Sequence, residues 1–267
     1  MASRCDTFRS LHDQGLFVMP NPWDIGSARY LESLGFVALA TTSSGHAATL
    51  GRIDQEVSRD EMLAHVAGIA AAIAVPLNVD AEYCFADDPA GVAETVALIA
   101  QAGAAGCSIE DFNPATGTID SIERASDRVA GAARSARQSG MVLTARAENH
   151  LHGVTDLDDT INRLCSYRDA GAEVVYAPGL SDLSEIARVV DEVKIPVNFL
   201  LRSDGPNVSE LGSVGVRRVS TGGSLSRASF AALKIAALEL LDLGTATFSA
   251  IPNAELAAVF LQSPGPG

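Results

Sequence analysis

Eight short runs of apolar, β-prone residues recur along this chain, and a longer segment with helical periodicity follows each of them. This alternation is typical of βα units that build a parallel sheet. Eight such units close into a (β/α)8 TIM barrel, a fold that regularly forms one α/β domain at a length of 267 residues. We therefore expect a single domain over 1–267, with strands at residues 16–19, 36–41, 76–82, 106–110, 142–147, 173–177, 196–200 and 216–221.

The last part of the chain is expected to lie outside the eight units. Residues 244–267 begin with Gly-Thr-Ala-Thr-Phe, continue as a short apolar helix over 253–261 and end in a Ser-Pro-Gly tail. A helix left over after eight units packs either on a neighbouring subunit or on its own barrel, and the residues alone leave both arrangements open.

Charge and cysteine usage exclude several classes of partner. The chain has 19 basic and 33 acidic residues and a net charge of -14, which argues against binding to nucleic acid or to an anionic membrane. Its four cysteines show neither disulfide-framework nor zinc spacing, so we expect reduced thiols. We also see no signal peptide and no apolar run of membrane-spanning length, and we expect a cytoplasmic protein.

Acidic residues follow two consecutive predicted strands. Asp80 and Glu82 are two residues apart, so their side chains point to the same face of a strand, and Glu110 ends the next strand. The carboxyl ends of barrel strands meet on one rim, where these acids would form a site for a hard divalent cation, held directly or through water. Any one of them alone would be read as a solvated acid. Together they predict a magnesium site.

Arg146 lies inside the apolar run 142–147, where an unpaired guanidinium would be costly. It either forms an ion pair with Glu110 or Glu148, or it grips a substrate carboxylate with two hydrogen bonds. We favour the second interpretation because its expected neighbours are the metal ligands. The only lysines, Lys194 and Lys234, do not follow strands, so a lysine Schiff base is not expected.

The segment after the second strand contains Thr42, Ser43 and Ser44. Small residues with hydroxyls and free amides suit a second carboxylate-binding nest, although such segments are commonly ordinary loops. Asp54, further along the same connection, carries no signal by itself.

Several of these segments together resemble the isocitrate lyase/phosphoenolpyruvate mutase superfamily. The resemblance runs from about residue 17 to 248, with the motifs in the superfamily's order, and is closest to its methylisocitrate-lyase-like and mutase-like branch. The motifs are Asn21-Pro22-Trp23-Asp24, Thr41-Thr42-Ser43-Ser44-Gly45 with Leu50-Gly51, Asp80-Ala81-Glu82-Tyr83, Ile109-Glu110-Asp111 and Arg146-Ala147-Glu148-Asn149.

The resemblance implies a Mg²⁺-dependent barrel, with Mn²⁺ as a substitute. It further implies a homotetramer, a dimer of dimers, whose last helix is exchanged between subunits. The implied roles are Asp80 and Glu82 as the acidic metal pair, Glu110 as a further acid around the metal, Arg146 as the substrate-binding arginine, Asp54 as a pocket acid, Thr42 to Ser44 as the loop that binds a substrate carboxylate, and Asn198 as a substrate-binding amide.

The segment that would form the lid departs from the superfamily. Lyase members carry a cysteine acid/base there within a Lys-Lys-Cys-Gly-His or Lys-Arg-Cys-Gly-His motif, and the mutase branch carries a lysine and an asparagine. Residues 112–119 contain neither cysteine nor lysine, and Asn113 corresponds only loosely to the asparagine. The proton donor must therefore come from elsewhere.

Three residues that follow strand ends are unusual for this branch, namely His46, Cys84 and His150. A histidine near a rim is either a hydrogen-bonded surface residue or an acid/base, and we include His46 and His150 among the catalytic candidates. His152 is expected to face solvent.

The expected function is cleavage of a carbon-carbon bond in a small 2-oxo or 2-hydroxy (di)carboxylic acid. A magnesium-dependent lyase or decarboxylase would do this through a metal-stabilised enolate, with Arg146 offsetting charge. Two alternatives remain open. One is a phosphonopyruvate-type hydrolase or mutase that uses Asp54, and the other is a catalytically silent carboxylate-binding barrel.

Overall fold

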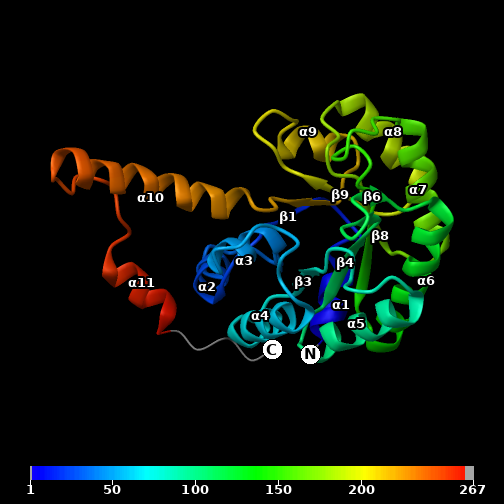
Figure 1. Cartoon of the computed structure of the whole chain (residues 1–267), viewed down its shortest axis with the longest axis horizontal. Helices are drawn as coiled ribbons and strands as arrows, with labels where there is room; N and C mark the ends of the chain where they lie inside the picture. Colours follow the sequence, from blue (N-terminus) through cyan, green and yellow to red (C-terminus); the bar gives the residue numbers. More distant parts are fainter. Residues whose placement is uncertain (1, 262–267) are drawn as a thin grey trace.

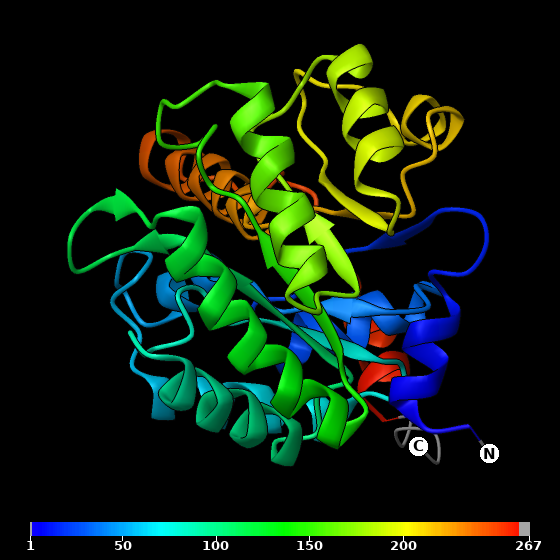
Figure 2. The same cartoon turned by 90° about the vertical axis from the view of Figure 1, so that its right-hand side faces the viewer.

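The computed structural model describes residues 2–261, and its centre is one eight-stranded parallel sheet. The sheet nearly closes on itself. Its two edge strands approach each other where the N–H of Ala40, in the second strand, donates to the carbonyl of Pro20, just after the first strand, at 3.1 Å. Helices surround it (Figures 1 and 2), so the predicted (β/α)8 barrel is confirmed. In sheet order, the strands are β1 (Phe17–Met19), β10 (Arg218–Ser220), β9 (Val197–Leu200), β8 (Val174–Tyr176), β7 (Val142–Arg146), β4 (Gly106–Glu110), β3 (Leu77–Asp80) and β2 (Leu39–Ala40).

Every predicted strand is present, and the differences lie at the ends. β4 spans the predicted residues, whereas β2 is shorter than the predicted 36–41. The backbone of β2 pairs with β3 only at Leu39 and Ala40, and Val37, before it, is 47% exposed. The apolar run predicted a strand there, but a strand ends where its neighbour no longer offers hydrogen bonds.

The helices cover the outside of the barrel, and several helix-to-strand junctions turn at glycine. Gly103 and Gly171 have φ angles of +96° and +111°, a region that glycine enters without strain. A Cβ on Gly171 would also approach Ala133 Cβ at 2.9 Å. The helices are α1 (Arg4–Ser10), α2 (Ile25–Ser33), α3 (Ser43–Thr49), α4 (Arg59–Ala72), α5 (Pro89–Gln101), α6 (Ile122–Ser139), α7 (Leu157–Asp169), α8 (Leu183–Val193), α9 (Val208–Ser213), α10 (Ser224–Leu243) and α11 (Asn253–Phe260).

One helix and one hairpin of the fold were not predicted. Helix α1 lies against the amino-terminal end of the barrel, where the rings of Phe8 and His12 pack edge to face with centroids 5.0 Å apart. The segment expected as a lid is a short antiparallel hairpin of β5 (Phe112–Asn113) and β6 (Thr118–Ile119).

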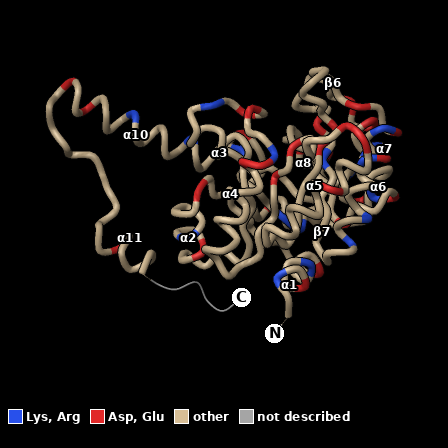
Figure 3. Tube along the Cα trace, turned by 60° about the horizontal axis from the view of Figure 1, so that its bottom comes forward, with Lys and Arg blue, Asp and Glu red and all other residues tan. Residues whose placement is uncertain are grey.

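Helix α10 extends away from the barrel, and α11 returns to it (Figure 1). Along α10 large apolar side chains are exposed, including Leu233 at 62% and Leu241 at 80%, and Figure 3 shows few charges there. Helix α11 contacts its own α2, because Tyr30 Oη donates to Glu255 Oε1 at 2.5 Å. The predicted helix over 253–261 is confirmed, whereas the predicted tail lies outside the described residues.

Within residues 2–261, no helix is both long and apolar enough to cross a membrane.

Candidate active site

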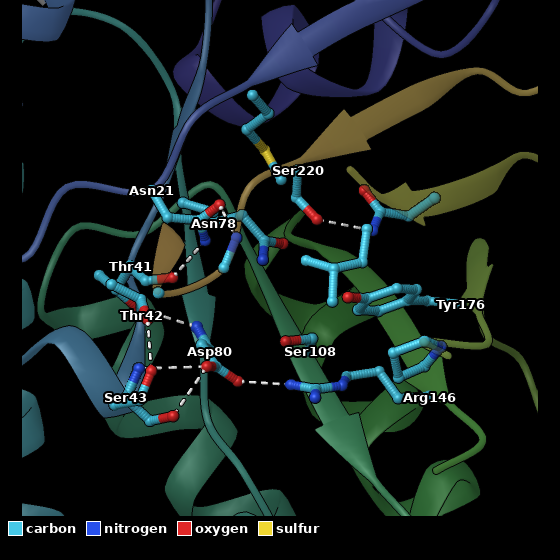
Figure 4. A pocket seen from close by; sticks show the side chains of 18 of the residues that line it. Asn21, Thr41, Thr42, Ser43, Asn78, Asp80, Ser108, Arg146, Tyr176 and Ser220 are labelled. Carbon is cyan, nitrogen blue, oxygen red and sulfur yellow. Dashed lines mark hydrogen bonds and ion pairs between the residues drawn. The ribbon is translucent and has the colours of Figure 1, made fainter. Parts of the chain in front are cut away.

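A cavity of about 240 Å³ opens at the carboxyl ends of the barrel strands. Asp80 at the end of β3, Arg146 at the end of β7 and Asn198 in β9 all line it, although they are far apart in the sequence. Figure 4 shows Asp80 and Arg146 pointing toward each other and joined as an ion pair on the cavity wall. The strand ends therefore meet on one rim, as the sequence predicted.

Arg146 is the positive centre of this rim. Its Nη1 lies 2.7 Å from Asp80 Oδ1, its Nε 2.7 Å from Glu148 Oε1 and its Nη2 3.3 Å from Glu110 Oε2. Burial lowers the pKa of Arg146, but these carboxylates outweigh burial and keep it well above its usual value. The ion pairs that we weighed against substrate binding are thus present, and Arg146 also faces the cavity.

Asp80 is oriented by the segment that follows β2. The N–H and Oγ of Ser43 donate to Asp80 Oδ2 at 3.1 and 3.0 Å, while Asp80 Oδ1 receives Arg146. In the other direction, the Asp80 N–H donates to Thr41 Oγ1 at 2.9 Å. Bonds from both sides fix the carboxylate at the cavity wall.

Three further acids crowd the same region, and burial is the main cause of their shifted pKa values. The pKa of Glu82 rises to about 8 through burial, with repulsion from Asp80 and Asp54 adding to it. Burial and Asp80 also raise the pKa of Asp54. Burial raises that of Glu110 well above its usual value despite the opposing charge of Arg146. The site therefore contains more acidic groups than the single positive charge of Arg146 can neutralise.

Gln55 connects two of these acids. Its backbone N–H donates to Glu82 Oε1 and its Nε2 to Glu110 Oε1, each at 3.2 Å. Gln55 and Glu82 both have left-handed backbones, with φ of +70° and +50°. Such conformations cost energy in residues other than glycine and persist only where the surroundings impose them. The sequence analysis missed Gln55, because a loop amide carries no signal of its own.

The donor set fits a magnesium ion that retains part of its water shell. Within the described chain, no three His, Cys, Asp or Glu side chains converge tightly enough to enclose an ion by themselves. Mg²⁺ commonly binds through one or two carboxylates and keeps several waters. Asp80 faces the cavity and would be the direct ligand, while Glu82 and Glu110 would act through water. The excess of acids over cations supplies the charge for such an ion.

This crowding predicts that Mg²⁺ binds more tightly as the pH rises from 6 to 8. Glu82, with a pKa of about 8, holds a proton in the metal-free protein that the cation must displace. We expect about a tenfold or larger increase in affinity, measured by titration calorimetry. In Glu82→Gln most of this increase should vanish, while equal wild-type affinity at both pH values would contradict the prediction.

The predicted carboxylate loop forms the first turn of α3. Thr42 caps the helix, because its Oγ1 accepts the N–H of Gly45 at 3.3 Å, and Thr42, Ser43 and Ser44 all line the cavity. The segment that begins α10 lies close by. A Cβ on Gly223 would lie 2.7 Å from Ser44 Oγ, so a larger residue there would displace the Ser44 hydroxyl.

The histidines lie away from the cavity lining. His46 stacks on His65 with ring centroids 3.7 Å apart and lines two neighbouring hollows. His150 packs under Gly179, and its neighbour Leu151 reaches the cavity instead. Burial lowers the pKa of both His46 and His150. Their catalytic role stays a prediction.

Two other expectations concern Cys84 and His152. Cys84 is fully buried and is not among the residues that line the cavity, and burial raises the pKa of its thiol to about 12. His152 is exposed, as predicted, and stacks on Phe112 of the β5–β6 hairpin.

The cavity also contains residues that the sequence analysis missed. Tyr176, Ser220 and Arg218 line it together with Asn198. The Asn198 amide donates from Nδ2 to Ser220 Oγ at 2.9 Å and accepts from Arg218 Nε at 2.8 Å. Arg218, like Arg146, is a charged residue within an apolar strand, so the pattern that identified Arg146 in the sequence could also have identified Arg218.

The fold and rim together define a TIM-barrel protein with an acidic site at the carboxyl ends of its strands. Residues 8–241 match the family described as phosphoenolpyruvate phosphomutase. The chain belongs to this family, and so to the phosphoenolpyruvate mutase/isocitrate lyase superfamily.

Individual relatives agree with this assignment. A Burkholderia cenocepacia crystal structure, named only provisionally as a lyase/mutase, is 46% identical with a TM-score of 0.94, covering 98% of this chain and 96% of that one. Oxaloacetate acetylhydrolase in complex with oxalate is 26% identical with a TM-score of 0.87, covering 97% and 94%. The 2-methylisocitrate lyase of Escherichia coli is 31% identical over 172 residues, covering 61% of this chain and 57% of that protein.

Proposed function

We propose that the protein is a magnesium-dependent lyase or decarboxylase that cleaves a carbon-carbon bond in a small 2-oxo or 2-hydroxy (di)carboxylic acid. The observation that carries the proposal is the pairing of Arg146 with an excess of buried carboxyl groups at one cavity. Such a cavity receives a cation and an anionic ligand together. The similarity to enzymes that are named for this chemistry supports the proposal.

Each residue has a distinct part in this scheme. Asp80 would hold Mg²⁺ or Mn²⁺, with Glu82 and Glu110 bonded to its water shell. When bound, the ion would polarise the substrate carbonyl and stabilise the enolate charge that bond cleavage leaves. Arg146 offsets the negative charge of the ligand.

Hydrogen-bond donors around the cavity would orient the substrate. Ser44 and Thr42 lie at the amino-terminal end of α3, and Asn198 of β9 lines the same cavity. The Asn198 amide uses one Nδ2 hydrogen on Ser220, which leaves the other for a ligand oxygen. These groups would hold the carboxylate while the bond beside the carbonyl breaks.

The proton donor must come from this chain's own side chains. Asp54 lines the cavity, and its raised pKa lets it hold a proton at higher pH than an ordinary aspartate. We assign the acid/base role to Asp54, with His46 and His150 as further candidates. Both lysines are exposed, so the scheme contains no Schiff base.

A panel of 2-oxo and 2-hydroxy mono- and dicarboxylic acids tests the reaction. The purified protein is incubated with each acid, with and without Mg²⁺, and the products are read by mass. We expect metal-dependent loss of a carbon fragment from at least one acid. Release of inorganic phosphate from phosphonopyruvate would instead identify a hydrolase. Binding of a panel member without turnover of any of them would identify the protein as a carboxylate-binding barrel without catalytic activity.

We also propose that the protein is a homotetramer, a dimer of dimers, in which the C-terminal segment is exchanged between subunits. The exposed apolar side chains of α10 support this proposal, because a projecting helix with Leu233 and Leu241 in water is unfavourable.

Light scattering after size exclusion is expected to give a mass of about four times 27.7 kDa. Leu241→Glu should shift the mass to a smaller species, because a charge would then lie in the buried interface. Lys234→Gln, on the same helix, is the matched control and should not. A monomeric wild-type protein would contradict the proposal.

A further inference from the structure

Arg218 lies at the inner end of the cavity, on β10, and is 1% exposed. Its Nε donates to Asn198 Oδ1 and its Nη2 to Thr144 Oγ1, each at 2.8 Å, while its Nη1 lies 3.3 Å from His12 Nε2. The guanidinium thus reaches from β10 to β9 and β7 and forms part of the cavity floor. Each Nη keeps a second hydrogen for which the described residues supply no acceptor.

The partners of Arg218 are all neutral. His12 Nδ1 contacts the carbonyl of Phe8 at 2.9 Å, which leaves Nε2 as the acceptor for Arg218. Burial and the neighbouring Arg218 lower the pKa of His12 to about 3, so its ring carries no charge. Within residues 2–261, no carboxylate forms an ion pair with Arg218. The other fully buried arginine, Arg128, lies 3.6 Å from Asp120 Oδ2.

Arg218 and Arg146 mark the two ends of one row of residues. Arg146 pairs in register with Tyr176, Tyr176 with Asn198 and Asn198 with Arg218, across β7, β8, β9 and β10. All of them line the cavity. Barrel strands are tilted, so such a row descends from the rim toward the interior. Figure 4 shows the start of this wall, with Tyr176 beside Arg146 and Ser220 beyond it.

The two ends of this row differ in charge. At the rim, carboxylates already surround Arg146, whereas at the floor the charge of Arg218 has no counterion. A buried and unpaired cation is unfavourable unless an anion reaches it. The cavity connects this cation with the rim, so a ligand bound at the rim can supply that anion.

We propose that Arg218 forms a second anion subsite, which receives a second carboxylate of a substrate whose 2-oxo or 2-hydroxy acid end binds at the rim. The inference rests on the proposed function and narrows it from mono- or dicarboxylic acids to dicarboxylic acids. Asn198 and Ser220, beside Arg218 on the same wall, would contact the segment between the two acid groups.

Matched ligand pairs test the subsite. The pairs are 2-oxobutyrate with 2-oxoglutarate and lactate with malate, whose members differ by one carboxylate. Calorimetry with Mg²⁺ compares the wild-type protein with Arg218→Met and Arg218→Lys. Arg217→Met is the matched control, because the preceding arginine is on the outside and donates to the carbonyl of Gly15.

We expect wild-type protein to bind the diacid at least tenfold more tightly than the monoacid in at least one pair. Arg218→Met should remove this preference for the diacid and change the affinity for the monoacid by no more than about twofold. Arg218→Lys should keep part of the preference, and Arg217→Met should keep all of it. Equal wild-type affinities in both pairs would overturn the subsite, even if the variants do not fold. An equal loss for mono- and diacids in Arg218→Met would also overturn it, since Arg218 would then only position Asn198. Mg²⁺-independent binding of the monoacids would instead contradict the proposed function.

Discussion

Asp80→Asn is expected to lower kcat/KM on the order of a thousandfold, because the substitution removes the cavity-lining carboxylate that we propose as the direct metal ligand. Asparagine keeps the size of the side chain and can still accept the bond from Arg146 Nη1. The fold should therefore persist. Mg²⁺ is expected to raise the melting temperature of the wild-type protein, and the same variant should lose this rise.

Asp87→Asn is the matched control for this experiment. Asp87 is an exposed acid in the connection after β3, and it pairs with Arg124 at 3.1 Å, away from the cavity lining described above. Its substitution should leave both turnover and the Mg²⁺ response unchanged. Metal-dependent activity that survives in Asp80→Asn would show that another group holds the ion.

Arg146→Met is expected to have the second largest effect, and it should lower stability as well as activity. The change leaves Asp80, Glu110 and Glu148 without their shared cation. Removing one partner of a buried ion pair typically costs about 3–5 kcal/mol, which urea unfolding would measure. Activity should fall about a hundredfold or more.

The loss of stability in Arg146→Met should depend on pH. Burial raises the pKa of Glu110 and Glu148 in the folded protein, so the folded state holds protons that the unfolded chain releases. The free energy of unfolding therefore falls as the pH rises above the ordinary glutamate pKa of 4.5. It should fall more steeply in the variant than in the wild type.

The exposed pair Arg52–Glu61 provides the comparison for Arg146→Met. Arg52→Met should change neither stability nor its pH dependence noticeably, because solvent screens the pair. An Arg146→Met protein as stable as the wild type at pH 8 would show that the rim acids tolerate one another without this cation.

The barrel could be predicted because apolar periodicity reflects burial directly. The run 106–110 is buried throughout and matches β4 residue for residue. Asp80, Glu110 and Arg146 could be predicted for a related reason, since a charge inside or directly after such a run must find a partner at the strand end.

Other parts of the site depend on geometry that the residue pattern does not encode. Arg217 and Arg218 are adjacent, and only the register of β10 shows which of them points inward. Gln55 reaches Glu82 and Glu110 through a loop with a left-handed backbone. The stacking of His46 on His65 depends on how α3 and α4 pack.

The junction between β10 and α10 joins two parts of the molecule that have separate roles. A Cβ on Gly45 would lie 3.4 Å from Ser226 Cβ in the first turn of α10, and the same α3 turn contains Ser43, which holds Asp80. A displacement of α10 would therefore be transmitted to the Asp80 carboxylate through a short series of contacts. In the tetramer proposed above, contacts between subunits along α10 would therefore lie only a few residues in space from the Asp80 carboxylate.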